Sequence, residues 1–309
     1  MKKEFSQQVW NFELESDLKQ LIQTAIWEDG RDRGDLTSSA LIPADIRGKA
    51  SVMAREDGVA AGLVAVKTLL KEVDPELDWL VIAHDSDLLK KGDKLGEIVG
   101  PVQCMLTAER LLLNFVGRLS GIASLTQKYV QAIKGTNARI YDTRKTTLGW
   151  RRLEKYAVRC GGGNNHRSGL FDAVLIKDNH LAFGNSTNFN PAQAVQKAKS
   201  YLNQRFVDAI PIIEVEVDSL EQLKLVLPEN PDIVLLDNMN AVLLQEAVQI
   251  RNEKNPAVEL EASGGITLQT VREAALAGVE RISVGALTHS AKTFDIGLDW
   301  EYTETGMDG

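Results

Sequence analysis

Apolar residues follow one rhythm near the start of the chain and a different rhythm after residue 135. From 14 to 28 they recur three and four positions apart, which predicts an amphipathic helix. Segment 34–38 has the composition of a turn, and short apolar runs broken by Gly and Asp predict strands at 49–55, 79–84 and 94–99. These elements predict a small α+β domain.

A long helix is predicted from Cys104 to about Lys134. Apolar residues occupy nearly every side of it, and they are Leu106, Leu111, Leu112, Leu113, Phe115, Val116 and Leu119. A helix that is apolar all round is expected to be buried. We therefore expect this helix to lie between domains or between subunits.

After Gly135, short apolar strands alternate with helices. The predicted strands are 139–142, 173–177, 211–217, 233–237, 258–262 and 281–284. The predicted helices are 192–204, 219–226, 241–251 and 268–277. Such alternation is typical of a parallel sheet, and continuously apolar strands are covered on both faces. Six strands of this kind predict a parallel α/β barrel, complete or incomplete.

Polar residues stand at the end of each predicted barrel strand. In chain order they are Asp142 with Arg144 and Lys145, Lys177 with Asp178, Glu216, Asp237 with Asn238, Glu261 with Ser263-Gly264-Gly265, and Gly285. The active site of an α/β barrel forms at the carboxyl ends of its strands. One such residue could simply end a strand or cap a helix. All six strand ends together predict a site that combines cations and carboxylates.

Composition and charge narrow the class of protein. The chain has 309 residues and a net charge of −8, which argues against a general nucleic-acid-binding protein. No stretch approaches the ~18 apolar residues of a membrane span, and residues 1–10 lack the apolar core of a secretory signal. Cys104 and Cys160 lie far apart without metal-ligand spacing. We expect two buried structural thiols and a cytoplasmic protein.

One segment of this acidic chain is strongly basic. From Arg139 to Arg167 there are eight Arg or Lys residues and two acids, a local balance of +6. Some of these cations have helical spacing and are expected to form a solvated helix face, namely Arg151, Arg152, Lys155 and Arg159. Others follow apolar strands or lie beside a glycine triplet, which favours anion binding; these are Arg144, Lys145 and Arg167, joined by Lys177 further along.

Two glycine-containing segments favour phosphate binding. Ser263-Gly264-Gly265 precedes a predicted helix and Gly285 ends the next strand, as in barrel loops that hold phosphate with backbone N–H groups. The triplet at 161–163 lacks the spacing of a dinucleotide-binding loop or a P-loop. Glu216 and Asp237 offer hard oxygen ligands, which predicts Mg²⁺ beside a phosphorylated substrate.

Short motifs occur in a fixed order along nearly the whole chain. They are Gly34-Asp-Leu-Thr37, Glu109-Arg-Leu-Leu-Leu-Asn114, Asp142-Thr-Arg-Lys-Thr-Thr147, Lys155-Tyr-Ala-Val158, Cys160-Gly-Gly-Gly-Asn-Asn-His-Arg167, Leu175-Ile-Lys-Asp-Asn-His180, Glu214-Val-Glu-Val217, Leu235-Leu-Asp-Asn238, Ala262-Ser-Gly-Gly-Ile266 and Ile282-Ser-Val-Gly-Ala-Leu-Thr-His289. As a set they resemble the quinolinate phosphoribosyltransferase family. The resemblance implies an incomplete parallel α/β barrel with a smaller N-terminal α/β sandwich domain.

The resemblance also implies boundaries and assembly. The sandwich domain would span 1–115, joined by the last residues from about 289 to 309, and the barrel domain would span 116–288. The family forms homodimers, in which the N-terminal domain of one subunit closes the barrel mouth of the other. A larger assembly of such dimers stays open, and neither nucleic acid nor membrane is expected as a partner.

The implied activity is that of a decarboxylating pentosyltransferase. Quinolinate and phosphoribosyl pyrophosphate would give nicotinate mononucleotide, pyrophosphate and carbon dioxide for NAD biosynthesis. By resemblance Arg144, His166 and Arg167 bind quinolinate, and Arg110 comes from the partner subunit. The remaining substrate-binding residues would be Lys145, Lys177, Glu216, Asp237, Ser263, Gly264, Gly265 and Gly285. Of these, Lys145, Lys177, Glu216 and Asp237 would act in catalysis, the last two directly or as ligands of Mg²⁺.

Alternatives stay open at this point. A nicotinate-specific phosphoribosyltransferase or a molybdenum-transport-associated relative would share the fold and the phosphate site, and an anion-binding or RNA-binding module without activity is a further alternative. Arg144, His166 and Arg167 together favour quinolinate. The chain departs from the family at Leu148 and Trp150, where proline often follows the paired threonines. We expect a shifted loop there, with the chemistry intact.

The remaining histidines are expected to have structural roles. His84 and His289 are predicted to be structural, and His180 is predicted to shape the loop after Lys177.

Overall fold

The computed structural model describes residues 4–184, 190–206 and 210–301, and its chain divides into two compact units. The barrel unit consists of the residues up to Gln7, Lys128–Lys145 and Gly163–His289. The sandwich unit consists of Gln8–Gln127, Thr146–Gly162 and the residues from Ser290 onward. The boundary implied at 115/116 falls inside one long helix, α4 (Val102–Ala132), so the units divide the chain differently from the sequence prediction.

Six parallel strands form the sheet of the barrel unit, in the order β6-β11-β10-β9-β8-β7. Their bounds are β6 (Arg139–Tyr141), β7 (Ala173–Ile176), β8 (Ile212–Val217), β9 (Ile233–Asp237), β10 (Glu259–Ser263) and β11 (Arg281–Ser283). Within the described residues β6 and β7 are the edges of this sheet and do not pair with each other. The barrel is therefore incomplete, and the predicted fold class is confirmed.

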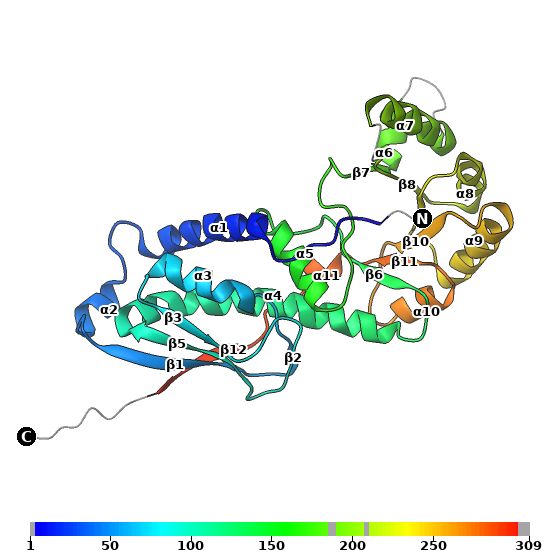
Figure 1. The fold of residues 1–309 in the computed structure, drawn as a ribbon. Helices are drawn as coiled ribbons and strands as arrows, with labels where there is room; N and C mark the ends of the chain where they lie inside the picture. Colours follow the sequence, from blue (N-terminus) through cyan, green and yellow to red (C-terminus); the bar gives the residue numbers. More distant parts are fainter. Residues whose placement is uncertain (1–3, 185–189, 207–209, 302–309) are drawn as a thin grey trace, which may run out of the picture. The chain divides into compact units, whose positions relative to one another are not determined.

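Helices follow the strands and lie along the outer side of the sheet (Figure 1). They are α7 (Pro191–Arg205), α8 (Leu220–Val226) with the short 3-10 helix η1 (Leu227–Glu229), α9 (Ala241–Lys254) and α10 (Val271–Leu276). Asn190, Ser219 and Asn240 cap the first residues of α7, α8 and α9 with their side-chain oxygens. Such caps satisfy N–H groups that have no partner within the helix, which explains where these helices begin.

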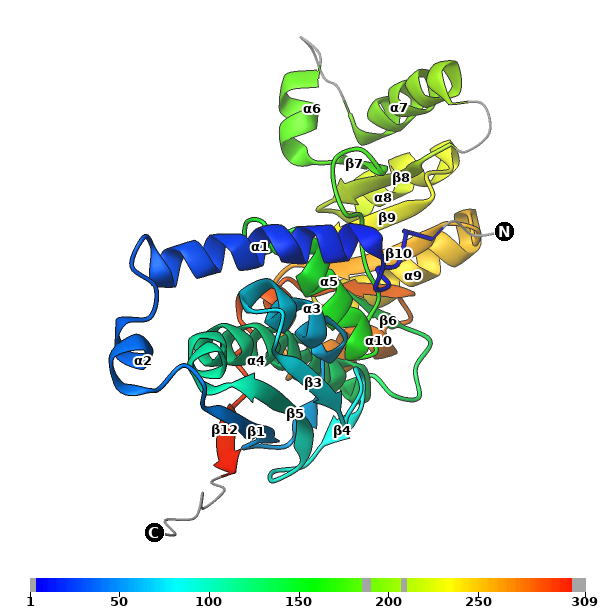
Figure 2. The same ribbon diagram turned by 60° about the vertical axis from the view of Figure 1, so that its left-hand side comes forward.

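The sandwich unit contains an antiparallel sheet with strand order β12-β1-β5-β3 (Figure 2). The strands are β1 (Arg47–Ala54), β3 (Asp78–Val81), β5 (Lys94–Pro101) and β12 (Ile296–Glu301), and β2 (Gly58–Val59) pairs separately with β4 (Leu88–Leu89). Helices α3 (Leu63–Val73) and α4 lie on one side of the sheet, and α1 (Phe12–Gly30) packs on α3. The last described strand, β12, thus returns to this unit.

Local sequence explains most of these elements. Leu14, Leu18 and Ile22 of α1 are buried at helical spacing, as predicted. The predicted turn at 34–38 was wrong, because Asp35 accepts a hydrogen bond from the Ser38 N–H at 3.0 Å and caps α2 (Leu36–Leu41). Among the described residues no helix is long and apolar enough to cross a membrane.

The predicted solvated face of the basic helix was wrong. That segment forms α5 (Arg151–Cys160), but Lys155 is fully buried. Arg152 forms ion pairs with Glu13 and with Asp17, each at 2.6 Å. Cys160 is buried as predicted. Cys104 is only half-buried, and its thiol donates a hydrogen bond to the carboxylate of Asp74.

Candidate active site

The carboxyl ends of the barrel strands surround a cavity of about 650 Å³. Every predicted substrate-binding residue except Arg110 lines it, that is Arg144, Lys145, His166, Arg167, Lys177, Glu216, Asp237, Ser263, Gly264, Gly265 and Gly285. Arg110 lies exposed on α4 of the sandwich unit. The fold thus gathers side chains that are far apart in sequence, while their individual roles stay predictions.

A buried aspartate holds the segment that carries His166 and Arg167. Asn164 continues the sheet beside β6, where its N–H donates to the Ile140 carbonyl at 2.8 Å. The carboxylate of Asp142 is fully buried and accepts the backbone N–H of His166 at 2.8 Å and the side-chain amide of Asn165 at 2.7 Å. These bonds fix the backbone of His166 at the open edge of the barrel.

Two guanidinium groups share the basic end of the cavity. Arg167 is 7% exposed and donates to the Ala173 carbonyl at 3.3 Å. Burial lowers the pKa of Arg167, and the positive charge of Arg144 lowers it further. Because two cations in one partly desolvated space repel each other, an anion between them is strongly favoured.

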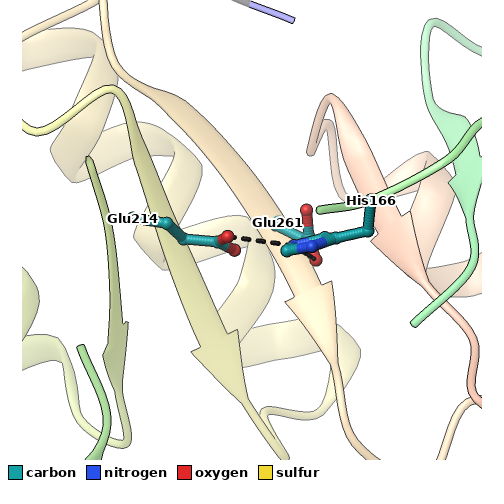
Figure 3. Close-up of side chains that lie close together, drawn as sticks. All are labelled: His166, Glu214 and Glu261. Atoms are coloured by element: carbon teal, nitrogen blue, oxygen red, sulfur yellow. Dashed lines mark ion pairs between the residues drawn. The ribbon is translucent and has the colours of Figure 1, made fainter. Parts of the chain in front are cut away.

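His166 points its ring toward two buried glutamates (Figure 3). Its Nε2 is 2.9 Å from Oε2 of Glu214 on β8 and 3.5 Å from Oε1 of Glu261 on β10. Burial alone would lower the pKa of His166, but the two carboxylates outweigh it and raise the pKa to about 10. The backbone N–H of Arg167 lies 2.8 Å from Nδ1 of His166. A hydrogen bond there requires an unprotonated Nδ1, whereas the raised pKa favours a proton on both ring nitrogens. With or without a proton on Nδ1, Nε2 faces the carboxylate of Glu214, which fixes the position of that nitrogen.

The same three side chains have the composition of a metal site. Their ligand atoms lie within 4.8 Å of one another. However, Nε2 of His166 already forms an ion pair with Glu214, and the guanidinium Nε of Arg281 lies 3.1 Å from Glu261. Protein cations therefore balance the two carboxylates, and we interpret the cluster as a support for His166.

Two further carboxylates lie at the ends of neighbouring strands. Glu216 forms an ion pair with Lys177, and Asp237 accepts a hydrogen bond from the Asn238 amide at 2.8 Å. Glu216 is in register with Leu235, two residues before Asp237, so both carboxylates belong to the same face of the sheet. Mg²⁺ commonly takes one or two carboxylates and completes its shell with water and substrate phosphates. The donor set of this cavity fits that pattern.

Glycines shape the loop after β10. Gly264 and Gly265 have φ of +90° and +61°, which side-chain-bearing residues rarely adopt. A Cβ atom on Gly264 would lie 2.3 Å from Oδ1 of Asn238. The predicted helix after this loop starts only at Val271, so the loop backbone, rather than a helix end, borders the cavity.

Lys145 and Gly285 meet at another side of the cavity. The Thr288 hydroxyl donates to the Lys145 carbonyl at 2.6 Å, and a Cβ atom on Gly285 would lie 3.0 Å from Cδ of Lys145. The same Cβ atom would be 3.2 Å from Nε2 of His289, on α11 (Ala286–His289). His289 lines the cavity, so the prediction of a purely structural role for it missed a candidate site residue.

Five other polar residues of the cavity were not predicted as ligands. They are Thr143, Asn238, Glu261, Thr267 and Ser283. Each stands within or beside a strand-end motif, which is the signal that could have identified it. Lys177 is followed directly by α6 (Asp178–Gly184), and its N–H donates to Nδ1 of His180 at 2.9 Å. His180 therefore shapes the turn after Lys177, as predicted.

The divergent loop lies outside this cavity's lining residues. Leu148 is 91% exposed, and Gly149 has φ of +80°. The N–H and hydroxyl of Thr147 both donate to the buried carboxylate of Glu154. The loop is thus held at its start, and the shift expected at Leu148 stays a prediction.

Comparison with known proteins gives matches along most of the chain. Residues 35–120 match the family model of the quinolinate phosphoribosyl transferase N-terminal domain, and residues 122–299 match that of its C-terminal domain. Nicotinate-nucleotide pyrophosphorylase (carboxylating) of Mycobacterium leprae is 44% identical over 90% of this chain and 95% of its own. The chloroplastic protein of that name from Arabidopsis thaliana is 41% identical over 91% and 82%. The structure of the Francisella tularensis nicotinate-nucleotide pyrophosphorylase superimposes with a TM-score of 0.84 at 35% identity, covering 96% of this chain and 100% of that chain.

Proposed function

This chain belongs to the quinolinate phosphoribosyltransferase family, and we propose that it transfers phosphoribosyl from phosphoribosyl pyrophosphate to quinolinate with loss of carbon dioxide. The product is nicotinate mononucleotide, for NAD biosynthesis. The observation that carries this proposal is the composition of one cavity, which joins Arg144, His166 and Arg167 to the carboxylates of Glu216 and Asp237.

Quinolinate binds at the basic end of the cavity. Its two adjacent carboxylates match the planar donor fork of arginine better than a single ammonium group. Arg144 and Arg167 receive these carboxylates, and the imidazole of His166 lines the cavity beside them. The mutual repulsion of the two guanidinium groups is relieved when the dianion enters, which favours quinolinate over a monocarboxylate such as nicotinate.

Phosphoribosyl transfer separates charge along the cavity. The pyridine nitrogen attacks the anomeric carbon as pyrophosphate leaves, so positive charge develops on the ribose and negative charge on the leaving group. Glu216 and Asp237 stabilise the cationic ribose, and Lys145 and Lys177 stabilise the departing phosphates. Glu216 and Asp237 would also hold Mg²⁺, which neutralises pyrophosphate when bound.

The remaining groups hold the ends of the two substrates. The loop at Ser263, Gly264 and Gly265, with Gly285, receives the 5′-phosphate through backbone and hydroxyl groups. After transfer the pyridinium ring accepts the electron pair released with carbon dioxide from the carboxylate beside the nitrogen. The cationic nitrogen stabilises this pair on the ring carbon that carried the carboxylate, and that carbon then takes up one proton from solvent to give nicotinate mononucleotide.

A homodimer completes the site in this proposal. Arg110 is exposed on α4 and is the one predicted quinolinate ligand absent from the lining of the cavity in the described residues. Supply of Arg110 by a partner subunit accounts for both observations. We also propose a cytoplasmic location. Both cysteines are free thiols, as is usual in a reducing compartment.

One assay tests the activity. Purified protein, quinolinate, phosphoribosyl pyrophosphate and Mg²⁺ should release carbon dioxide and form nicotinate mononucleotide in equal amounts. Absence of product, or equal use of nicotinate, contradicts the proposal.

Mixed dimers test the shared site. Arg110→Ala and Arg144→Ala should each be nearly inactive, because each removes a charge-assisted carboxylate contact worth about 1.5 to 3 kcal/mol. If Arg110 serves the partner's cavity, mixing and re-associating the two variants restores one intact site in each mixed dimer. Activity that stays at the level of the separate variants rules out this sharing.

A further inference from the structure

The N-terminal segment Glu4–Gln7 belongs to the barrel unit and is anchored in it. Phe5 is 5% exposed and packs in an apolar cluster with Ala173, Ile212 and Ile233. These partners stand at the starts of β7, β8 and β9, the ends opposite the cavity. The segment thus covers the bottom of three neighbouring strands.

Polar contacts fix both ends of this segment. Gln7 accepts the Asn165 N–H at 2.8 Å and donates to the Asn165 carbonyl at 3.1 Å, directly before His166. Glu4 accepts hydrogen bonds from Arg139 and from the Tyr141 hydroxyl, each at 2.8 Å, and from Arg281 at 3.2 Å. The position of Phe5 is therefore defined on either side.

Phe5 stacks directly on the imidazole of His166. The ring centroids are 4.4 Å apart and the planes differ by 29°. Glu214 and Glu261 hold Nε2 of His166 (Figure 3), and the backbone N–H of Arg167 holds Nδ1. Those contacts restrain the ring edge, whereas Phe5 supports one face. His166 reaches the cavity, while Phe5 is outside its lining residues.

We propose that the segment Glu4–Gln7 supports the substrate site from the opposite end of the strands and that its Phe5 is a positioning residue for His166. An imidazole rotates about two side-chain bonds, and the contacts at its two ring nitrogens act on the ring edge, so the remaining freedom is a tilt of the ring plane. A stacked ring removes that freedom before the substrate arrives. The proposal rests on the proposed function, since His166 is there a quinolinate ligand.

This part of the chain is independent of the family matches. The N-terminal family model begins at residue 35, so Glu4–Gln7 lie outside both matched ranges. Comparison of motifs would not reveal the contribution of Phe5. The support for it is the fold itself, which brings residue 5 against residue 166.

Kinetics of matched variants test the proposal. Phe5→Leu keeps an apolar side chain but removes the ring, and Phe5→Tyr keeps the ring. Misplacement of a binding group by about 1 Å can cost up to about 100-fold, so for Phe5→Leu we expect KM for quinolinate to rise on the order of tenfold. KM for phosphoribosyl pyrophosphate and kcat should stay within about twofold, and Phe5→Tyr should restore most of the affinity.

Two controls separate positioning from general destabilisation. Ile212→Ala removes packing from the same apolar cluster and should lower the midpoint of thermal unfolding without raising KM for quinolinate. Ser6→Ala changes an exposed residue of the same segment and should alter neither quantity. An unchanged quinolinate KM in Phe5→Leu, or an equal rise in Ile212→Ala, overturns the proposal.

An NMR measurement tests the contact without activity. The chain has four histidines, so the imidazole protons can be assigned by substitution. In the free protein, the Phe5 ring should shift the His166 ring protons upfield, and Phe5→Leu should abolish that shift while Phe5→Tyr retains it. A His166 spectrum indifferent to Phe5→Leu overturns the positioning role. If the wild-type protein makes no nicotinate mononucleotide, the proposed function fails instead, and this spectrum still reports on the contact.

Discussion

Arg281 is a buried cation of the barrel unit, and its replacement tests how much its ion pairs contribute to the stability of that unit. The residue is fully buried on β11. Its guanidinium lies 3.1 Å from Glu261 and 3.2 Å from both Glu259 and Glu4, and 3.8 Å from the centre of the Tyr141 ring. Arg281→Met keeps much of the apolar stem and removes only the charge and the donors.

The expected cost follows from what is left behind. Glu261 is fully buried and Glu259 is 6% exposed, so each of these two carboxylates would lose one of its cations, with His166 left beside Glu261 and Arg139 beside Glu259. Removing one partner of a buried ion pair costs about 3 to 5 kcal/mol. At about 2 to 4 °C per kcal/mol for a domain of this size, the unfolding midpoint of the barrel unit should fall by about 6 to 20 °C.

Arg139 provides the matched control. It sits on the neighbouring strand β6 and pairs with the same Glu4 and Glu259, but its side chain is 42% exposed. Exposed ion pairs contribute about 0 to 1 kcal/mol. Arg139→Met loses two such pairs and should therefore shift the midpoint by no more than about 8 °C.

The assay must report on the correct unit. Trp10, Trp27, Trp79, Trp150 and Trp300 are all of the tryptophans, and every one belongs to the sandwich unit. Tryptophan fluorescence therefore follows that unit, and far-UV circular dichroism follows both. In Arg281→Met the dichroism transition should move to lower temperature more than the fluorescence transition.

The pH dependence of the effect has a definite sign. Burial alone would raise the pKa of Glu261, but His166 and Arg281 lower it to about 2 from an ordinary value of 4.5. A carboxyl with a lowered folded pKa contributes stability above about pH 4.5 and loses it as the pH falls towards 2. The difference between wild type and Arg281→Met should therefore be largest near neutrality and narrow below pH 4.5. Equal midpoints for Arg281→Met and Arg139→Met at pH 7 would refute this reasoning.

Three further predictions concern the cavity and the thiols. Gly264→Ala should raise KM for phosphoribosyl pyrophosphate by at least about tenfold, because φ of +90° and a 2.3 Å approach to Asn238 strain any side chain by about 1 to 3 kcal/mol; initial rates that match wild type would argue against a phosphate loop there. EDTA should stop product formation and Mg²⁺ restore it, and Asp237→Asn should need more Mg²⁺ for half-maximal rate; full activity in EDTA would count against the metal. Burial raises the pKa of Cys104 to about 11 and of Cys160 to about 12. At pH 7.5 both thiols should therefore react with a chromogenic disulfide far more slowly in the native protein than in the urea-unfolded protein. Fast labelling of Cys160 in the native protein would contradict its burial.

The barrel strands were predictable because their sequence is dominated by one effect. In β9 the residues Ile233 to Leu236 are all buried, and the predicted bounds 233–237 match those observed. A continuously apolar run of that length has few alternatives to a strand covered on both faces. The polar residue after each run then lies at the mouth, which is why most of the candidate site could be located from sequence.

Charges that are buried inside the unit were not predictable in the same way. Glu214 and Glu216 stand two residues apart on β8 and point to the same side, yet Glu214 is fully buried and Glu216 borders the cavity. The sequence predicts that the two carboxylates share one side of the strand, but it does not predict how deeply each one is buried. Lys155 was misjudged for a related reason, because helical spacing identifies a polar face without revealing what covers it.

The contribution of Phe5 depended on tertiary structure alone. Residues 1–10 form a polar stretch without strand or helix periodicity, and nothing in them indicates a partner 161 positions away. The short helix α2 was missed for a local reason, since one aspartate cap can start six helical residues where glycine and polar residues suggest a turn.

The division of the chain into units has a consequence for recombination. The polypeptide passes from one unit to the other after Gln7, Gln127, Lys145, Gly162 and His289, so neither unit is a single stretch of gene. An exchange between related genes at residue 121, between the two matched family ranges, would inherit Phe5 from one parent and His166 from the other. Such a hybrid would keep every recognisable motif, but the residue at position 5 and the histidine on which it stacks would come from different parents. Chimeras of this family should therefore exchange residues 4–7 together with the barrel.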